Sequence, residues 1–131
     1  MKSDHSKLEV LIVDDEPVML KMIEYGLKAI GIKNVTIANN GQMACDLVEI
    51  SNEPFDIILC DWNMPGMNGL EFLKKLRADG NKTKFIMLTG NASPENVKAA
   101  VEAGANSYLA KPFTPQDLHK RVKLIVKSLS T

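Results

Sequence analysis

The strongest constraint on the fold of this chain is a fivefold alternation between two kinds of segment. Short runs rich in Val, Ile, Leu and Phe recur at intervals of roughly 25 residues, and they are apolar almost throughout rather than at every second position. The runs cover residues 8–13, 35–38, 55–60, 84–88 and 107–110. Continuously apolar runs of this length are typical of strands that helices cover on both faces, so the sequence predicts a parallel sheet.

The segments between these runs carry apolar residues at helical spacing. Pro17, Pro94 and Pro115 mark the beginnings of three of the predicted helices. Within the third helix, Glu71 and Lys75 are spaced to form a surface ion pair. The predicted helices cover residues 17–30, 42–51, a segment that includes 70–76, 94–104 and 115–129. Strict alternation of strand and helix predicts an open, doubly wound α/β sheet with right-handed crossovers.

Size, charge and composition exclude several classes of protein. The 131 residues suffice for one domain, residues 1–131 with a core over 8–129, and 45% of them are apolar. Sixteen Lys and Arg balance sixteen Asp and Glu, and only seven residues are aromatic, which disfavours nucleic acid as a partner. The longest apolar runs are four residues, far short of the ~20 that cross a bilayer. We therefore expect a cytoplasmic protein that binds neither nucleic acid nor membrane.

Polar residues of complementary chemistry follow four of the apolar runs. Asp14 and Asp15 follow the first run, Asp61 the third, Thr89 the fourth and Lys111 the fifth. The carboxyl ends of parallel strands meet at one edge of the sheet, where ligands bind in such folds. These five side chains are therefore expected to lie close together.

The carboxylates at this edge require a cation between them. Two carboxylates 4 Å apart repel by roughly 4 kcal/mol at an effective dielectric constant of 20. Oxygen ligands without a nearby His or Cys suit Mg²⁺, and Lys111 supplies a second positive charge. A carboxylate beside a divalent ion, an ammonium and a hydroxyl can attack a phosphoryl group and hold its oxygens. The set predicts phosphoryl transfer to an aspartate.

Each of these residues taken alone has a simpler structural explanation. Asp14 and Asp15 could cap the helix that begins at Pro17, Lys111 could be a solvated loop residue, and Thr89 could stabilise a turn. Capping does not explain four complementary groups that follow four separate buried strands. The combination favours a phosphoryl-transfer site.

The sequence resembles the receiver domains of two-component response regulators, and within that family the stand-alone chemotaxis regulators. The likeness extends over residues 8–129. It rests on the following segments: Asp14-Asp15, Asp61-Trp62-Asn63-Met64-Pro65-Gly66-Met67-Asn68-Gly69, Leu88-Thr89-Gly90, and Tyr108 with Lys111-Pro112-Phe113. The resemblance implies a flavodoxin-like fold, with a five-stranded parallel sheet in the order 2-1-3-4-5 and five helices.

The resemblance also implies roles for the residues at the sheet edge. Asp61 corresponds to the phosphoacceptor of the family, and Asp14 and Asp15 correspond to its acidic metal-binding pair. The backbone carbonyl of Asn63 is expected to complete the protein ligands of Mg²⁺. Lys111 corresponds to the amine that pairs with the phosphate.

A second group of residues corresponds to the switch of the family. Thr89 matches the switch hydroxyl and Tyr108 the switch aromatic. The bond before Pro112 is often cis in the family. Gly90 stands where Ala is common, and Asn91 occupies a position that tunes the lifetime of the acyl phosphate.

Together these matches imply a phosphorylation-activated switch that is not an enzyme with a separate substrate. A histidine kinase is the expected donor, a phosphatase is a further candidate partner, and the expected output is control of the flagellar motor in chemotaxis. The alternative is a stand-alone phosphorelay receiver of another pathway. The downstream target is expected on the face formed by the fourth helix, fifth strand and fifth helix. That face carries Tyr108 and the basic residues Lys98, Lys120, Arg121, Lys123 and Lys127.

Two other classes of protein share parts of this pattern. A Mg²⁺-dependent phosphatase of the haloacid dehalogenase type needs an acid/base Asp two residues after its nucleophile, but Asn63 stands there after Asp61. A flavodoxin needs a phosphate-binding loop of Ser, Thr and Gly after the first strand, where Asp14-Asp15-Glu16 would repel phosphate. No G-x-G-x-x-G or Walker loop is present either. The signalling switch is therefore the favoured interpretation.

Overall fold

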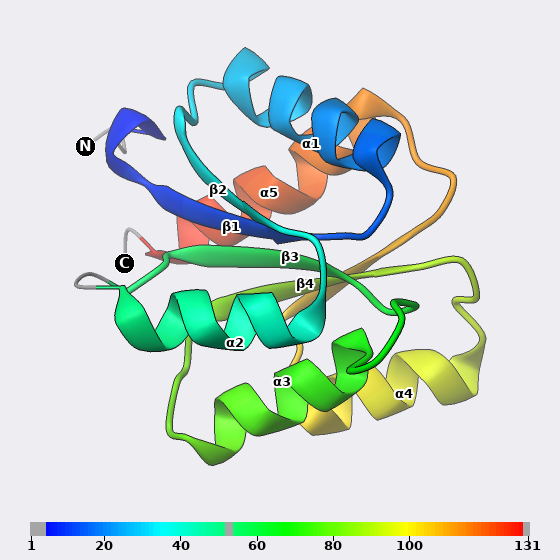
Figure 1. Ribbon diagram of the computed structural model, residues 1–131. Coiled ribbons are helices and arrows are strands. Elements are labelled where there is room, and N and C mark those ends of the chain that lie inside the picture. Colours follow the sequence, from blue (N-terminus) through cyan, green and yellow to red (C-terminus); the bar gives the residue numbers. More distant parts are fainter. Residues whose placement is uncertain (1–4, 52–53, 130–131) are drawn as a thin grey trace.

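The computed structural model describes residues 5–51 and 54–129 of the chain, arranged as three layers (Figure 1). A parallel sheet lies in the middle, with α1 and α5 on one face and α2, α3 and α4 on the other. The strands are β1 (Glu9–Val13), β2 (Asn34–Ala38), β3 (Ile57–Asp61), β4 (Lys84–Thr89) and β5 (Ser107–Ala110). The helices are the short 3-10 helix η1 (His5–Lys7) and α1 (Pro17–Ala29), α2 (Gly41–Ile50), α3 (Gly69–Ala78), α4 (Pro94–Ala103) and α5 (Pro115–Leu129). Within these residues no helix has the length and apolar character that crossing a membrane requires.

The strand order is β2-β1-β3-β4-β5, and every neighbouring pair is parallel. The predicted flavodoxin-like order is thus confirmed. From β1 the chain runs outward to β2 and then crosses back to β3 on the other side of β1. The order therefore reverses between β1 and β3, and the carboxyl ends of these two strands form the crevice in which such folds bind ligands.

Two strands extend one residue further at their carboxyl ends than the apolar runs predict. Asp61 is the last residue of β3, in register with Leu88, and Thr89 is the last residue of β4, in register with Ala110. The prediction that both residues follow their strands is therefore wrong. Backbone hydrogen bonds define the end of a strand, and a polar side chain at the sheet edge does not interrupt them.

The alternation of side chains along each strand divides the core into two clusters. On β1, Val10 and Ile12 face α1 and α5, whereas Leu11 and Val13 face the opposite helix layer. All four are fully buried. Burial on both faces explains why the runs are apolar at consecutive positions rather than at every second one.

The caps of α3 and α4 are formed by side chains close in sequence. Asn68 and Glu71 form a capping box on α3, in which Glu71 N donates to Asn68 Oδ1 at 2.9 Å and Asn68 N donates to Glu71 Oε1 at 3.0 Å. The predicted ion pair between Glu71 and Lys75 is therefore wrong, and Lys75 pairs with Asp79 at 3.6 Å instead. Ser93 caps α4, and its side chain accepts a hydrogen bond from Asn96 N.

Both histidines of the chain bond to carbonyl groups at the carboxyl end of α1, one in its last turn and one at its C-cap. His119 Nε2 lies 3.0 Å from the Gly26 carbonyl oxygen, and His5 Nδ1 lies 2.9 Å from that of Ile30. The final carbonyls of a helix lack donors within the helix, and these rings supply them. A Cβ at Gly26 would lie 2.8 Å from a Leu118 methyl group, so the missing side chain lets α1 and α5 approach closely.

Candidate functional site

Backbone hydrogen bonds at the sheet edge hold the predicted site residues in place. Asp14 N donates to the Ala38 carbonyl oxygen at 3.1 Å, which continues the pairing of β1 with β2 by one residue. Lys111 N donates to the Thr89 carbonyl oxygen at 2.7 Å, which continues the pairing of β4 with β5. Asp61 lies between them on the central strand β3. These bonds bring residues from the two halves of the chain to one edge.

The two-residue period of the strands separates the charged residues from the switch residues. Asp14, Asp61 and Lys111 continue the positions that face α1 and α5. Thr89 and Tyr108 fall in step with the positions that face α2, α3 and α4. The carboxylates and the ammonium therefore share one side of the sheet edge, and Thr89 and Tyr108 lie on the side of α4.

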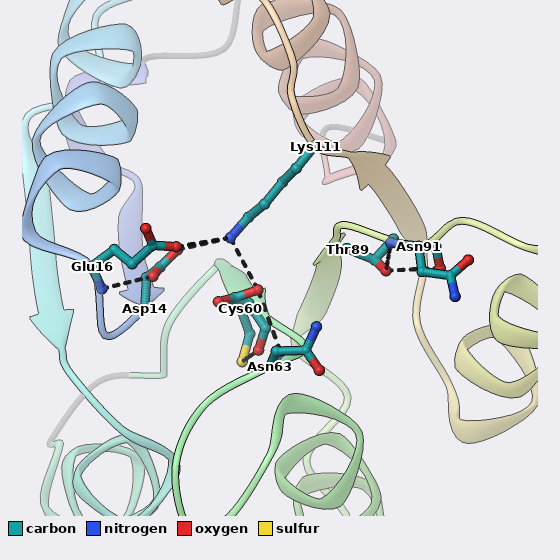
Figure 2. Close-up of polar contacts among 8 residues, drawn as sticks. Asp14, Glu16, Cys60, Asn63, Thr89, Asn91 and Lys111 are labelled. Carbon is teal, nitrogen blue, oxygen red and sulfur yellow. Dashed lines mark hydrogen bonds and ion pairs between the residues drawn. The ribbon is translucent and has the colours of Figure 1, made fainter.

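Lys111 lies at the centre of a cluster of carboxylates (Figure 2). Its Nζ is 3.1 Å from Asp61 Oδ1, 3.5 Å from Asp14 Oδ2 and 3.9 Å from Glu16 Oε1. Asp14 is fully buried and Asp61 is 3% exposed, whereas the side chain of Glu16 is 66% exposed. The ammonium thus binds two buried carboxylates, one directly after β1 and one at the end of β3, and Glu16 adds a solvated third contact.

The pKa values of Asp61 and Lys111 both depart from their ordinary values. Burial raises the pKa of the Asp61 carboxyl, and the hydrogen bond and charge of Lys111 offset only part of that effect. Burial alone would lower the pKa of Lys111, but the hydrogen bond and charge of Asp61, together with the charge of Asp14, raise it. Lys111 is therefore charged at neutral pH. The Asp61 carboxylate is incompletely compensated, which favours binding of a further cation.

Three carboxylates at this edge could hold such a cation. Asp14, Asp15 and Asp61 each offer an oxygen, and the three oxygens lie within 4.8 Å of one another. Asp14 and Asp61 are buried and Asp15 is exposed, so the group is open to solvent on one side. An all-oxygen set with one open side suits Mg²⁺, which keeps several of its water ligands. Asn63 lies beside this group, and its N–H points to Asp61 Oδ1 at 3.4 Å.

The two predicted switch residues make contacts on the α4 side. The buried Thr89 hydroxyl donates to the Asn91 carbonyl oxygen at 3.0 Å and accepts from Asn91 N at 3.0 Å (Figure 2). The half-buried Tyr108 ring lies under the Arg121 guanidinium, whose carbon is 5.3 Å from the ring centroid. Both side chains are therefore held in the described conformation by contacts that a switch would have to break.

The sequence analysis did not predict two features of the site: the contact of Glu16 with Lys111 and the close approach of Gly69 to β3. Glu16 directly follows the Asp pair, and this position could have indicated that its carboxylate lies near Lys111. Gly69 begins α3, and a Cβ there would overlap the Asp61 carbonyl oxygen and lie 2.9 Å from the Trp62 Cα. The close packing of α3 on the end of β3 thus depends on glycine. The bond before Pro112 is cis, as the resemblance implied.

The fold and this site have the features of a known signalling family. Residues 10–123 match the response regulator receiver domain, and the chain belongs to this family. Receiver domains of this kind are signalling switches rather than enzymes that turn over a separate substrate, and they generally use Mg²⁺.

Chemotaxis proteins are among the chain's relatives. It is 36% identical over 121 residues to chemotaxis protein CheY1 of Helicobacter pylori J99, covering 91% of this chain and 97% of that one. A CheY homolog of Campylobacter jejuni is 39% identical over 118 residues, with 88% and 90% covered. Among solved structures, Vibrio cholerae chemotaxis protein CheY4 superposes with a TM-score of 0.82 at 34% identity, covering 90% and 98%. A Francisella response regulator receiver domain gives 0.86 at 32%, covering 94% and 99%.

Proposed function

We propose that this protein is a single receiver domain, residues 1–131, that acts in the cytoplasm as a phosphorylation-activated switch. A histidine kinase transfers a phosphoryl group to Asp61 in the presence of Mg²⁺, and the phosphorylated form binds a downstream protein. The observation that carries the proposal is the Lys111 ammonium 3.1 Å from Asp61 Oδ1, next to the carboxylates of Asp14 and Asp15.

In the transfer step, an Asp61 carboxylate oxygen attacks the phosphorus of a phosphohistidine on the kinase. The new P–O bond forms as the P–N bond breaks, and the electron pair returns to the imidazole nitrogen. Lys111 balances charge on the transferred phosphoryl oxygens, because its ammonium already lies at the acceptor carboxylate. The Asp14 carboxylate holds that ammonium from the other side at 3.5 Å. The site therefore acts by positioning and electrostatics.

Asp14, Asp15, Asp61 and the backbone carbonyl of Asn63 would hold Mg²⁺, with Asp14 contacting the ion through water. The bound ion supplies positive charge that stabilises the phosphoryl oxygens during transfer. Support for this assignment comes from the 4.8 Å grouping of the three carboxylates and from the raised pKa of Asp61, which burial causes.

Phosphorylation reaches the target surface through Thr89 and Tyr108. A phosphoryl oxygen on Asp61 offers the Thr89 hydroxyl a strong acceptor and draws it away from Asn91. The space that Thr89 vacates allows the Tyr108 ring to turn, and this changes the face formed by α4, β5 and α5. The coupling acts by population shift and is about 1 to 3 kcal/mol, or about 5- to 150-fold in target affinity.

The output proposed here is control of the flagellar motor in chemotaxis, supported by relatives that are named chemotaxis proteins. Basic residues of α4 and α5 on the target face favour an acidic partner. A phosphorelay in another pathway is the alternative, and a phosphatase that removes the phosphoryl group is a further partner. Affinity capture with and without beryllofluoride, which mimics the phosphoryl group, separates these outputs by the partner retained.

Labelling tests the central step. Incubation with Mg²⁺ and a phosphorylated histidine kinase, or with acetyl phosphate, should give an acid-stable, base-labile acyl phosphate. Asp61→Asn should lose the label. Asp46→Asn should keep it, since Asp46 is an exposed carboxylate on α2. Wild-type labelling of Asp61→Asn would disprove the assignment of the acceptor.

A further inference from the structure

We propose that Asn96 is a positioning residue for the switch, because its side-chain amide keeps the Asn91 carbonyl hydrogen-bonded when the Thr89 hydroxyl leaves. This inference rests on the proposed function, in which phosphorylation of Asp61 draws Thr89 inward. The group concerned is the Asn91 carbonyl oxygen in the β4–α4 connection, which loses the Thr89 hydrogen bond.

The Asn91 carbonyl oxygen accepts two hydrogen bonds from opposite ends of this connection. Thr89 Oγ1, at the end of β4, donates to it at 3.0 Å. Asn96 Nδ2, in the first turn of α4, donates to it at 2.9 Å. A carbonyl oxygen has two lone pairs, so both donors can bind at once. Asn91 therefore joins the strand to the helix.

Asn96 is held in place independently of Thr89. Its backbone N–H donates to Ser93 Oγ at 3.3 Å, which is the N-cap bond of α4. Ser93 N in turn donates to Asn91 Oδ1 at 3.2 Å. These bonds lie within the first turn of α4 and its cap, and none of them involves Thr89. The Asn96 amide thus stays in position when the threonine hydroxyl turns away.

The second donor changes the free energy of switching. A carbonyl that loses its partner and finds no replacement raises the free energy of the switched state. With Asn96 present, the Asn91 oxygen remains hydrogen-bonded in both states. Without it, the oxygen depends on Thr89 before the switch and on water after it. Because Asn91 is exposed, water replaces part of the lost bond, and we expect an effect of about three- to tenfold on the switching equilibrium.

The same two bonds indicate how the signal enters α4. Before phosphorylation, the Asn91 carbonyl is attached both to β4 and to α4. After the Thr89 hydroxyl turns away, the remaining side-chain donor to the Asn91 carbonyl is Asn96 on α4. The connection then keeps its bond to the helix that forms part of the target face and loses this bond to the strand that ends beside Asp61.

Beryllofluoride binding in the presence of Mg²⁺ tests this inference without a target protein. If Thr89 must turn to contact the bound mimic, the cost of turning lowers the apparent affinity. Trp62 adjoins Asp61 and is the only tryptophan, so its fluorescence can follow the titration. Four proteins are compared: wild type, Asn96→Ala, Thr89→Ala and the double variant. Asn96→Ala should weaken binding about three- to tenfold in the wild-type background and less than twofold in Thr89→Ala.

Ser93→Ala is the matched control. It removes one of the bonds that position Asn96, the cap bond, but leaves the α4 backbone that carries Asn96 and the amide that bonds to the Asn91 carbonyl, so beryllofluoride affinity should change less than twofold. Equal weakening by Asn96→Ala in both backgrounds, or equal weakening by Ser93→Ala, would show that Asn96 only stabilises α4. No weakening by Asn96→Ala would also overturn the inference while leaving the proposed function intact. A wild-type protein that does not bind beryllofluoride would overturn both.

Discussion

Replacement of Gly69 by alanine should destabilise the protein at the site itself. A Cβ at this position would overlap the Asp61 carbonyl oxygen, and it would lie 2.9 Å from the Trp62 Cα and 3.1 Å from the Asp61 carbonyl carbon. All three atoms belong to the backbone at the end of the central strand. They cannot move aside as a flexible side chain could, so α3 or the end of β3 must shift.

The size of the effect follows from these contacts. Inserting a methyl group into a well-packed region costs about 1–3 kcal/mol. The Gly69 N–H also donates to the Trp62 carbonyl oxygen at 2.8 Å, and distortion of that bond adds about 0.5–1.5 kcal/mol. We therefore expect a loss of about 1.5–4.5 kcal/mol in the free energy of unfolding. For a chain of 131 residues this corresponds to a fall of about 5–16 °C in Tm.

Urea and thermal unfolding measure this loss, and Gly90→Ala is the control. Gly90 follows β4 at the same edge of the sheet, and a Cβ there would have no atom within 4 Å. Its backbone is not in the left-handed region, so alanine should leave stability unchanged or raise it by about 0.4–1 kcal/mol. If Gly69→Ala and Gly90→Ala unfold at the same temperature, the close approach of α3 to Asp61 does not constrain the fold and the reasoning is refuted.

Three further predictions concern the metal, the switch and the half-buried Arg77. Mg²⁺ should change Trp62 fluorescence. The affinity for Mg²⁺ should fall as the pH is lowered through the pKa of Asp61, which is raised above the ordinary value of 3.8, because protons compete with the ion for the carboxylate. A Mg²⁺ titration with no pH dependence in this range would contradict the metal assignment. Thr89→Ala should still be phosphorylated on Asp61 but lose most of the gain in target affinity, so an unchanged gain in a binding assay would disprove the switch pathway. Arg77 donates twice to the Gly104 carbonyl oxygen, at 3.1 and 2.8 Å, and Arg77→Ala should cost about 1.5–3 kcal/mol in urea unfolding; a loss below 0.5 kcal/mol would show that these bonds contribute little.

The fold was largely predictable because its sequence signal is periodic. Continuous apolar runs predicted each strand to within two residues at either end, since burial between two helix layers requires them. The strand order came from the resemblance, because the runs themselves do not determine which strand adjoins which. The predicted ends of β3 and β4 were one residue too early. Asp61 and Thr89 have polar side chains, so the apolar runs stop before them, but both residues still pair with the neighbouring strand.

The candidate site was predictable as a set of residues but not as a set of contacts. That Asp14, Asp61 and Lys111 share one edge follows from their positions at the ends of parallel strands. The bond from Thr89 to Asn91 and the second donor from Asn96 depend on how one loop turns, and no periodic pattern encodes that geometry. The close approach at Gly69 is equally hidden, because the sequence does not indicate which backbone atoms lie above a glycine.

The positions of His5 and His119 bear on where the phosphoryl donor proposed for Asp61 can come from. Each ring has a nitrogen bonded to a carbonyl at the carboxyl end of α1; His5 belongs to η1 and His119 to α5. Both rings are thus held against a helix of the outer layer, and neither belongs to the cluster at the strand ends. Neither His5 nor His119 is therefore placed to pass a phosphoryl group to Asp61. Under the proposed function, a phosphohistidine on another molecule would be the donor, and at limiting donor the rate of transfer should rise in proportion to the donor concentration.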